Sequence, residues 1–211
     1  QLFTTYLYNF FKEHPYGQQT VLGSVDHLKN PSLSKMREYY DTYYVANNMA
    51  LVLTGDIYPE DIKPLIEEKF GTWKSGELPG PIDITESSFN GREKIRKRMT
   101  PIKIGIMGFR TVPAGHEDEV AINLCNQLLI NESKTGLIDQ LEVEGKILGA
   151  GAFNMDYADL GANNFFFVPK LFFQSLTKAE NLVLGQIERL KSGDFDDEYF
   201  NAVKLTMIRQ H

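Results

Sequence analysis

The chain has 211 residues, of which 42% are hydrophobic and 24% are charged. This is enough apolar sequence to build a sizeable core as one or two domains. The net charge of −6 argues against a nucleic-acid partner, which would favour a basic face. No apolar run approaches the roughly 20 residues that a membrane-spanning helix needs. The composition is therefore that of a globular protein without a membrane span.

The first predicted helices lie in residues 2–12 and 33–44. Apolar side chains recur at helical spacing in both segments. His14 precedes Pro15, and a residue before proline is pushed out of the helical region, so the first helix should end there. Ser32 or Ser34 can cap the second helix, which is rich in tyrosine.

A short buried strand is predicted at residues 49–54, because this apolar run stops at Gly55-Asp56. A helix over residues 58–70 follows, and Gly71 is a suitable residue to end it. Pro64 lies inside this pattern and favours a helix start nearer Asp61.

Residues 75–90 form the best linker candidate in the chain. Ser, Gly, Pro and Glu replace the periodic apolar pattern here, with Gly76, Pro79, Gly80 and Pro81 as turn residues. A compact domain rarely holds so long a structureless loop. We therefore place a boundary here, between residues 1–74 and 91–211, and expect this segment to be the most mobile internal part of the chain.

The second part of the chain mixes strands and helices without a regular βαβ repeat. This pattern indicates an α+β fold, a layered mixed or antiparallel sheet with helices packed on one side. The predicted strands are residues 102–109, 148–155 and 163–171, and the predicted helices are residues 117–130, 137–143, 179–190 and 197–209.

Seven apolar residues are predicted to be almost wholly buried. They are Leu51, Val52, Leu53, Ile104, Ile106, Leu124 and Leu128. Cys125, the single cysteine, has the spacing of a residue in the buried stripe of its helix. No histidine lies near it in the sequence, which argues against a nucleophilic thiol.

A series of spaced landmarks in the first part resembles the insulinase/pitrilysin family of zinc peptidases, the inverzincins. The landmarks are His14-Pro15-Tyr16-Gly17, Leu22-Gly23-Ser24, the tyrosine-rich run to Tyr44, and Asn47-Asn48-Met49 with Gly55-Asp56. The second part resembles the front half of the next domain of such a peptidase, through Gly108-Phe109-Arg110, His116-Glu117-Asp118 and Leu141-Glu142. The resemblance implies that residues 1–74 are the back half of one repeat and residues 91–211 the front half of the following one.

The resemblance also implies that the metal site is missing. The family motif H-x-x-E-H does not occur in the chain, and the corresponding helix, residues 121–127, holds neither His nor Glu. A later glutamate ligand would fall between Lys204 and Gln210, where no acid stands. We therefore expect no catalytic residue and no metal ligand in this chain, and place the zinc in an upstream catalytic domain.

The four histidines do not replace the missing motif. His116-Glu117 begins an H-E-x-x-H pattern, but Val120 stands where the second histidine would be, and catalytic zinc needs three protein ligands. His14 is expected to form loop hydrogen bonds, His27 to face solvent or pack on the tyrosine-rich helix, and His211 is the terminal residue.

The resemblance implies a fragment of a zinc metalloendopeptidase that cleaves peptides in a closed chamber. This region would be non-catalytic and would supply chamber wall or substrate contacts. The alternative is a metal-free scaffold or binding subunit of a peptidase-like complex. Expected partners are the upstream catalytic domain, a peptide substrate, and a second copy in a homodimer formed by half-domain exchange. The two half-domains could instead close on each other within one chain. In both cases, residues 49–54 are expected to share one sheet with the strands of the second part.

Overall fold

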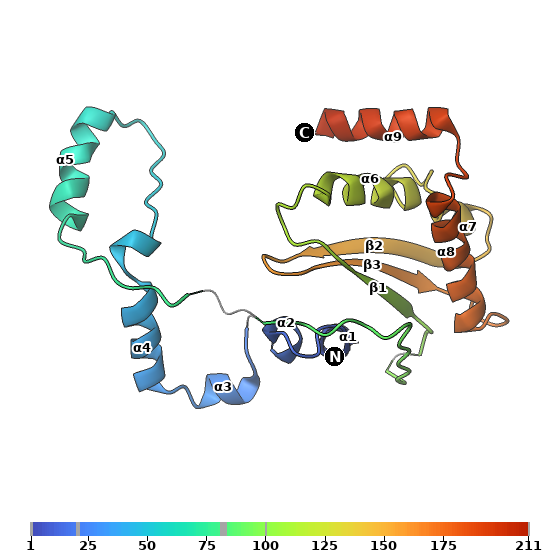
Figure 1. The fold of residues 1–211 in the computed structure, drawn as a ribbon, viewed down its shortest axis with the longest axis horizontal. Coiled ribbons are helices and arrows are strands. Elements are labelled where there is room, and N and C mark those ends of the chain that lie inside the picture. Colours follow the sequence, from blue (N-terminus) through green and yellow to red (C-terminus); the bar gives the residue numbers. More distant parts are fainter. Residues whose placement is uncertain (1, 20–21, 81–83, 100, 211) are drawn as a thin grey trace. The chain divides into compact units, whose positions relative to one another are not determined.

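The computed structural model describes residues 2–19, 22–80, 84–99 and 101–210. The chain divides into two compact units, Gln1–Lys94 (unit 1) and Ile95–His211 (unit 2). Figure 1 labels the elements of each unit. That residues 1–74 and 91–211 are halves of two successive repeats, joined by a linker at residues 75–90, stays a prediction.

Unit 1 is helical in its described residues. Its elements are α1 (Leu2–Phe10), α2 (Pro15–Gln18), α3 (Val25–Lys29), α4 (Leu33–Tyr43), the short 3-10 helix η1 (Ala46–Asn48) and α5 (Pro59–Phe70). Ser32 caps α4 by accepting a hydrogen bond from the N–H of Lys35, as the sequence indicates. Pro64 is accommodated inside α5, which begins at Pro59 and not near Asp61.

The motif at residues 14–17 is explained by the packing of α2 on α1. His14 caps α2, because its Nδ1 accepts a hydrogen bond from the N–H of Tyr16, and Pro15 occupies the first helical turn. A Cβ atom at Gly17 would collide with the backbone carbonyl oxygen of Phe11. Only glycine therefore allows this approach. His14 is buried and serves as a hydrogen-bonding group, as expected.

A carboxylate of the predicted linker is hydrogen-bonded to the segment that joins α1 and α2. Glu86 accepts hydrogen bonds from the backbone N–H groups of Lys12, Glu13 and His14, at 2.7, 3.0 and 2.7 Å. Phe89 also packs against Phe10. Residues 81–83, which include Pro81, lie outside the described residues, and the mobility of the segment stays a prediction.

The strand predicted at residues 49–54 is wrong. These residues carry no strand in the structure, and Leu51, Val52 and Leu53 are exposed, Val52 to 82%. The prediction that they share a sheet with the strands of unit 2 is also wrong, since the sheet that contains those strands consists of β1, β2 and β3. An apolar run is buried as a strand only where neighbouring strands satisfy its backbone, and no described strand pairs with this one.

Unit 2 contains a three-stranded antiparallel sheet, which confirms the predicted α+β class. Strand β1 (Gly105–Thr111) and strand β2 (Gly149–Asp156) both pair with the central strand β3 (Gly161–Val168). The sequence placed each strand within a few residues of these bounds. The order β1-β3-β2 leaves β1 and β2 as edges of the described sheet.

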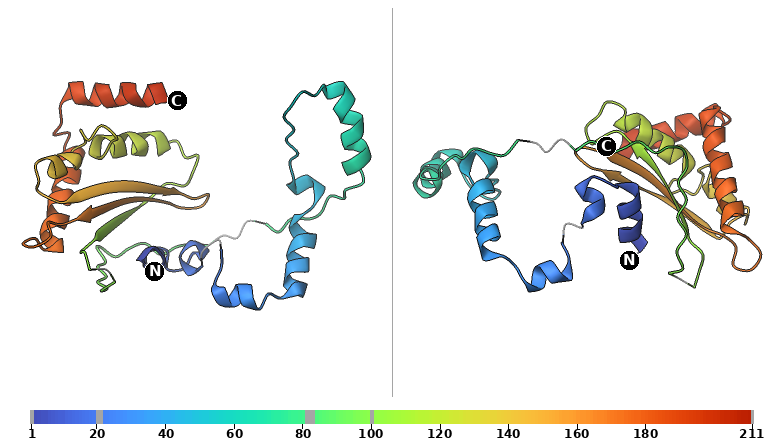
Figure 2. Two further views of the ribbon diagram at one scale, coloured as in Figure 1. Left: turned by 180° about the vertical axis from the view of Figure 1, so that it is seen from behind. Right: turned by 60° about the horizontal axis from the view of Figure 1, so that its bottom comes forward.

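Four helices complete unit 2: α6 (Glu119–Leu129), α7 (Asp139–Val143), α8 (Leu176–Lys191) and α9 (Asp197–Gln210). Helix α6 packs against α8 and α9. Figures 1 and 2 show α6 lying over the sheet, with α9 beyond it. The observed layers are therefore sheet, α6 and α9.

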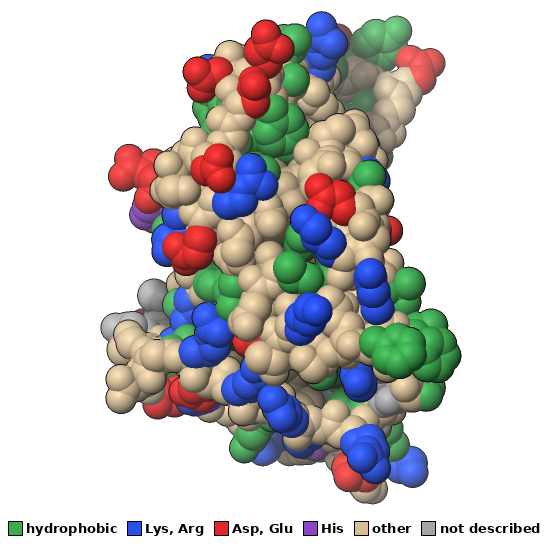
Figure 3. Space-filling view, turned by 90° about the vertical axis from the view of Figure 1, so that its right-hand side faces the viewer, with side chains coloured by type: hydrophobic (Ala, Val, Ile, Leu, Met, Phe, Trp, Pro, Cys, Tyr) green, Lys and Arg blue, Asp and Glu red, His purple; other side chains and the backbone are tan. Residues whose placement is uncertain are grey.

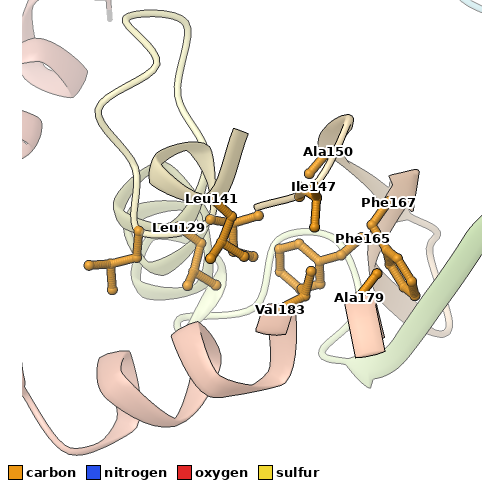
Figure 4. Close-up of a cluster of buried hydrophobic side chains, with 10 residues drawn as sticks. Leu129, Leu141, Ile147, Ala150, Phe165, Phe167, Ala179 and Val183 are labelled. Carbon is orange, nitrogen blue, oxygen red and sulfur yellow. The ribbon is translucent and has the colours of Figure 1, made fainter. Parts of the chain in front are cut away.

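The core of unit 2 fills the space between one face of the sheet and helices α6, α7 and α8. Phe165 and Phe167 of β3 and Ala150 of β2 point to this face, because side chains two residues apart share a face. Figure 4 shows them with Leu129, Leu141, Ala179 and Val183 from the helices. The predicted core is confirmed at Leu128, but Ile104 is 37% exposed and Ile106 and Leu124 are only half-buried. Ile104 precedes β1, outside the ladder that packs on the helices.

Candidate functional site

An open cavity of about 670 Å³ lies in unit 2 beside the free edge of β2. Its wall is built by α6, the loop after α6, residues 150–154 of β2, and α9. Most of its polar lining is carboxamide. The amide-bearing residues are Asn123, Asn126, Gln127, Asn131, Asn154 and Gln210.

The carboxamides of α6 and the sheet form a hydrogen-bonded chain. Asn126 donates from Nδ2 to Oδ1 of Asn154 at 3.1 Å, and Asn154 donates to Oδ1 of Asn123 at 3.0 Å. Asn163 donates to Oδ1 of Asn126. Asn154 and Asn163 are register partners on neighbouring strands, so both side chains point toward α6. We call Asn123, Asn126, Asn154 and Asn163 the amide network.

Two members of the amide network, Asn123 and Asn126, lie on α6, the helix on which the resemblance would place the missing metal motif. Asn123 and Gln127 are four residues apart, so they lie on one face of α6 and both line the cavity. Asn126 is buried. Neutral amides form hydrogen bonds with one another here, whereas zinc requires His, Cys or carboxylate ligands. Within the described residues, no group of three or more His, Cys, Asp or Glu side chains could hold a metal ion.

The loop after α6 forms the polar end of the cavity. Asp139 is fully buried, and its Oδ2 accepts hydrogen bonds from the N–H groups of Asn131 and Gly136 at 2.9 and 3.1 Å. Lys134 lies 3.5 Å from the other oxygen of Asp139 and 3.1 Å from Glu142. The hydrogen bond to Glu142 is the main cause of the raised pKa of Lys134. Hydrogen bonds and ion pairs between this loop and α7 therefore hold the loop conformation and pair its charged groups.

The apolar lining of the cavity wraps around the edge of β2. Ala150 and Ala152 belong to the face that α6 to α8 cover, whereas Phe153 and Phe166 belong to the opposite face. Among the strands that the structure describes, β2 pairs with β3 alone. An unpaired strand edge beside a groove can accept an extended peptide as an additional strand.

The other residues that the sequence singled out do not meet at this cavity. His116 is partly exposed, and its Nδ1 accepts a hydrogen bond from the N–H of Asp118. His27 lines a separate cavity of unit 1 with Tyr39, Tyr40 and Tyr44, which agrees with packing on that helix. His211 lies outside the described residues.

The prediction that Cys125 belongs to the buried stripe is wrong, because it is exposed. The buried residues of α6 are instead Asn126, Leu128 and Leu129. Asn126 can face inward because Asn154 and Asn163 satisfy its amide. Partial burial still raises the pKa of the Cys125 thiol, which opposes a reactive thiolate.

Residues 32–207 match the family described as Peptidase M16 inactive domain. The chain belongs to this family. The M16 inactive domain is found in zinc protease-like proteins: the chain is 23% identical over 211 residues to the zinc protease PqqE of Helicobacter pylori (strain ATCC 700392 / 26695). That match covers 96% of this chain and 45% of PqqE. A second relative is an uncharacterized zinc protease, YmfH of Bacillus subtilis (strain 168), 25% identical over 130 residues, covering 62% of this chain and 29% of YmfH.

Solved protease structures share the fold. A protease from Helicobacter pylori matches with a TM-score of 0.74 and 20% identity, covering 97% of this chain and 52% of that one. The ferredoxin protease FusC, solved as a mutant with Arabidopsis ferredoxin, matches with a TM-score of 0.72 and 16% identity, covering 95% of this chain and 23% of that one. The M16 inactive domain thus spans about half the length of these relatives or less. No described helix is long and apolar enough to cross a membrane.

The amide network is the part of the site that sequence reasoning missed. The sequence showed that residues 121–127 lack His and Glu, but it gave no hydrogen-bond partners for the two asparagines and the glutamine of this segment. The signal available was the spacing of Asn123, Asn126 and Gln127, which places polar side chains on the face that a metal motif would use.

Proposed function

We propose that this M16 inactive domain is the non-catalytic part of a zinc metalloendopeptidase-like protein, where it lines a peptidase chamber and contacts the peptide substrate. The observation that carries the proposal is the amide network on α6. By the resemblance, this helix would carry the metal motif in a catalytic copy, and the carboxamides that it holds here can bind a peptide backbone.

Peptide contact is supported by the chemistry of the cavity. A peptide backbone offers alternating N–H and C=O groups, and a carboxamide both donates and accepts hydrogen bonds. The free edge of β2 offers the same groups from its own backbone. An extended segment laid along β2 would therefore meet complementary groups from the strand and from the cavity wall.

The upstream catalytic domain is the proposed partner of unit 1. Leu22, Val52 and Leu28 are 83%, 82% and 70% exposed, and exposed apolar surface of this extent marks an interaction surface. The zinc, and a glutamate that activates zinc-bound water, would belong to that partner. Exchange of half-domains between two copies is a second way to cover the same side chains, with residues 49–54 supplied to another chain.

A peptide-binding measurement tests the role of the cavity. Binding of a fluorescent extended peptide is measured by polarisation for the wild-type chain and for Gln127→Arg, whose longer charged side chain would occupy the cavity. We expect Gln127→Arg to weaken binding at least about tenfold, equivalent to ~1.4 kcal/mol.

The matched control is Asn201→Arg, which places the same side chain on an exposed position of α9 outside the cavity. It should bind like the wild type. Equal affinity in all three proteins, or no binding by the wild type, would count against peptide contact at this cavity.

A further inference from the structure

The loop between β3 and α8 carries two of the most exposed large apolar side chains of the chain. Phe172 and Phe173 are 85% and 98% exposed, and the preceding Leu171 is 53% exposed. Their rings lie 6.5 Å apart. Exposed phenylalanines on consecutive residues are not explained by the core of unit 2, from which both point away.

The loop holds these rings outward by a fixed internal structure. Gln174 is buried, its Oε1 accepts a hydrogen bond from the N–H of Lys170 at 2.8 Å, and its Nε2 donates to the carbonyl oxygen of Lys146 at 2.9 Å. Ser175 caps α8 directly after it. With Gln174 turned inward and both loop ends anchored, the two phenylalanines form a protruding tip.

The loop that carries the tip is itself basic. Residues 169–178 contain Lys170 and Lys178 and no acid. Lys103 lies at the same end of the sheet, because Gly105 pairs with Phe167 and the chain before β1 continues along the end of β3. All three lysines are exposed, and within the described residues none of them forms an ion pair. Figure 3 shows Lys and Arg side chains on the face that carries a protruding apolar group at its edge.

We propose that the loop of residues 169–175 is an attachment site for an anionic lipid surface. The two phenylalanines insert at the interface between headgroups and acyl chains, and the lysines bind the anionic headgroups. A convex tip favours this occupant over a folded protein, which would need a matching hollow, whereas a lipid interface deforms around a protruding ring. Apolar insertion combined with basic residues is the pair of signals that peripheral attachment requires.

Co-sedimentation of the full chain with vesicles tests the proposal. Vesicles of phosphatidylcholine alone are compared with vesicles that also contain phosphatidylglycerol. We expect binding to the anionic vesicles, and a loss of at least about tenfold in affinity for Phe172→Ser/Phe173→Ser, because both inserted side chains are removed. Lys170→Glu/Lys178→Glu should lose binding to a similar extent, and high salt should weaken the wild type.

The control variant is Val120→Ser/Ile208→Ser, which removes two exposed apolar side chains of α6 and α9 outside the tip and should bind like the wild type. All variants change exposed residues, so their melting temperatures should match that of the wild type. Three results would overturn the proposal: no vesicle binding by the wild type, equal binding by the phenylalanine variant, or unchanged binding by the lysine variant. Loss of self-association in the phenylalanine variant, without vesicle binding by the wild type, would assign the tip to a protein contact.

Discussion

At the scale of single residues, the amide network explains how α6 can expose a polar face to a sheet without a metal. Each amide bonds to another amide, which offsets part of the desolvation cost of burying these groups. The sequence revealed the absence of His and Glu on this helix. It could not reveal the network, because Asn126, Asn154 and Asn163 come together only when the register of β2 and β3 is fixed.

Removing the central member of the network should therefore destabilise the fold. Asn126→Ala leaves the amide of Asn163 without its acceptor and Asn154 without its donor. We expect a loss of about 1–3 kcal/mol in the free energy of unfolding, the cost of leaving a buried polar group unpaired. Denaturant unfolding monitored by circular dichroism measures it. Asn201→Ala, on the exposed side of α9, is the control and should change little. Equal midpoints for both variants would mean that the network contributes no stability.

Tyr199 connects α9 to α6, and its hydroxyl should make the free energy of unfolding depend on pH in the alkaline range. Its hydroxyl donates to the carbonyl oxygen of Leu128 at 3.0 Å and accepts from Asn131. Burial raises the pKa of Tyr199, so the folded state holds this proton more tightly than the unfolded chain does. The resulting stability is fully present below the unfolded pKa of about 10 and is lost as the pH rises through the folded pKa.

We therefore expect the stability of the wild type to fall above pH ~10, and Tyr199→Phe to lose less in the same range. The variant should be less stable at neutral pH by about 1 kcal/mol, because a hydrogen bond is lost. Urea midpoints across the alkaline range give both quantities. Tyr58→Phe, at an exposed position, serves as the reference. A pH dependence in Tyr199→Phe as steep as in the wild type would contradict this role.

At the scale of elements, the sequence located most helices and all three strands of unit 2 because their apolar periodicity matches the observed packing. It failed at residues 49–54 for a physical reason. An apolar run of six residues indicates that its side chains are buried. It does not indicate which part of the protein, or which other protein, covers them. The short helices α2 and α3 were also missed, since helices of four and five residues carry too few turns for a periodic signal.

Two apolar side chains of the short helix α7 differ sharply in burial. Leu141 is 2% exposed and belongs to the core cluster, whereas Val143 on the same helix is 65% exposed. Leu141→Ala should cost about 2–5 kcal/mol, from lost burial and the remaining cavity. Val143→Ala should stay within about 0.5 kcal/mol, as surface substitutions do. Thermal unfolding of both variants measures the difference, and a similar melting temperature would show that α7 does not dock through Leu141.

At the scale of the molecule, the fold and the family agree with the resemblance seen in the sequence. The boundary between the two units lies after residue 94, a few residues beyond the linker predicted at residues 75–90. Composition indicated a break in that linker, yet Glu86 is hydrogen-bonded to the segment between α1 and α2, and Phe89 packs against Phe10 of α1. Such contacts between residues more than 70 positions apart could not be foreseen from local composition.

The central proposal is that this M16 inactive domain is the non-catalytic part of a zinc metalloendopeptidase-like protein, with amides on the helix where the resemblance would place the metal motif. The most direct measurement is the zinc content of the full chain after expression in zinc-containing medium and dialysis, together with hydrolysis of a quenched fluorescent peptide. We predict far less than one zinc per chain and no cleavage above a buffer control. One zinc per chain, lost on His116→Ala or on Asn123→Ala and accompanied by peptide cleavage, would contradict the claim.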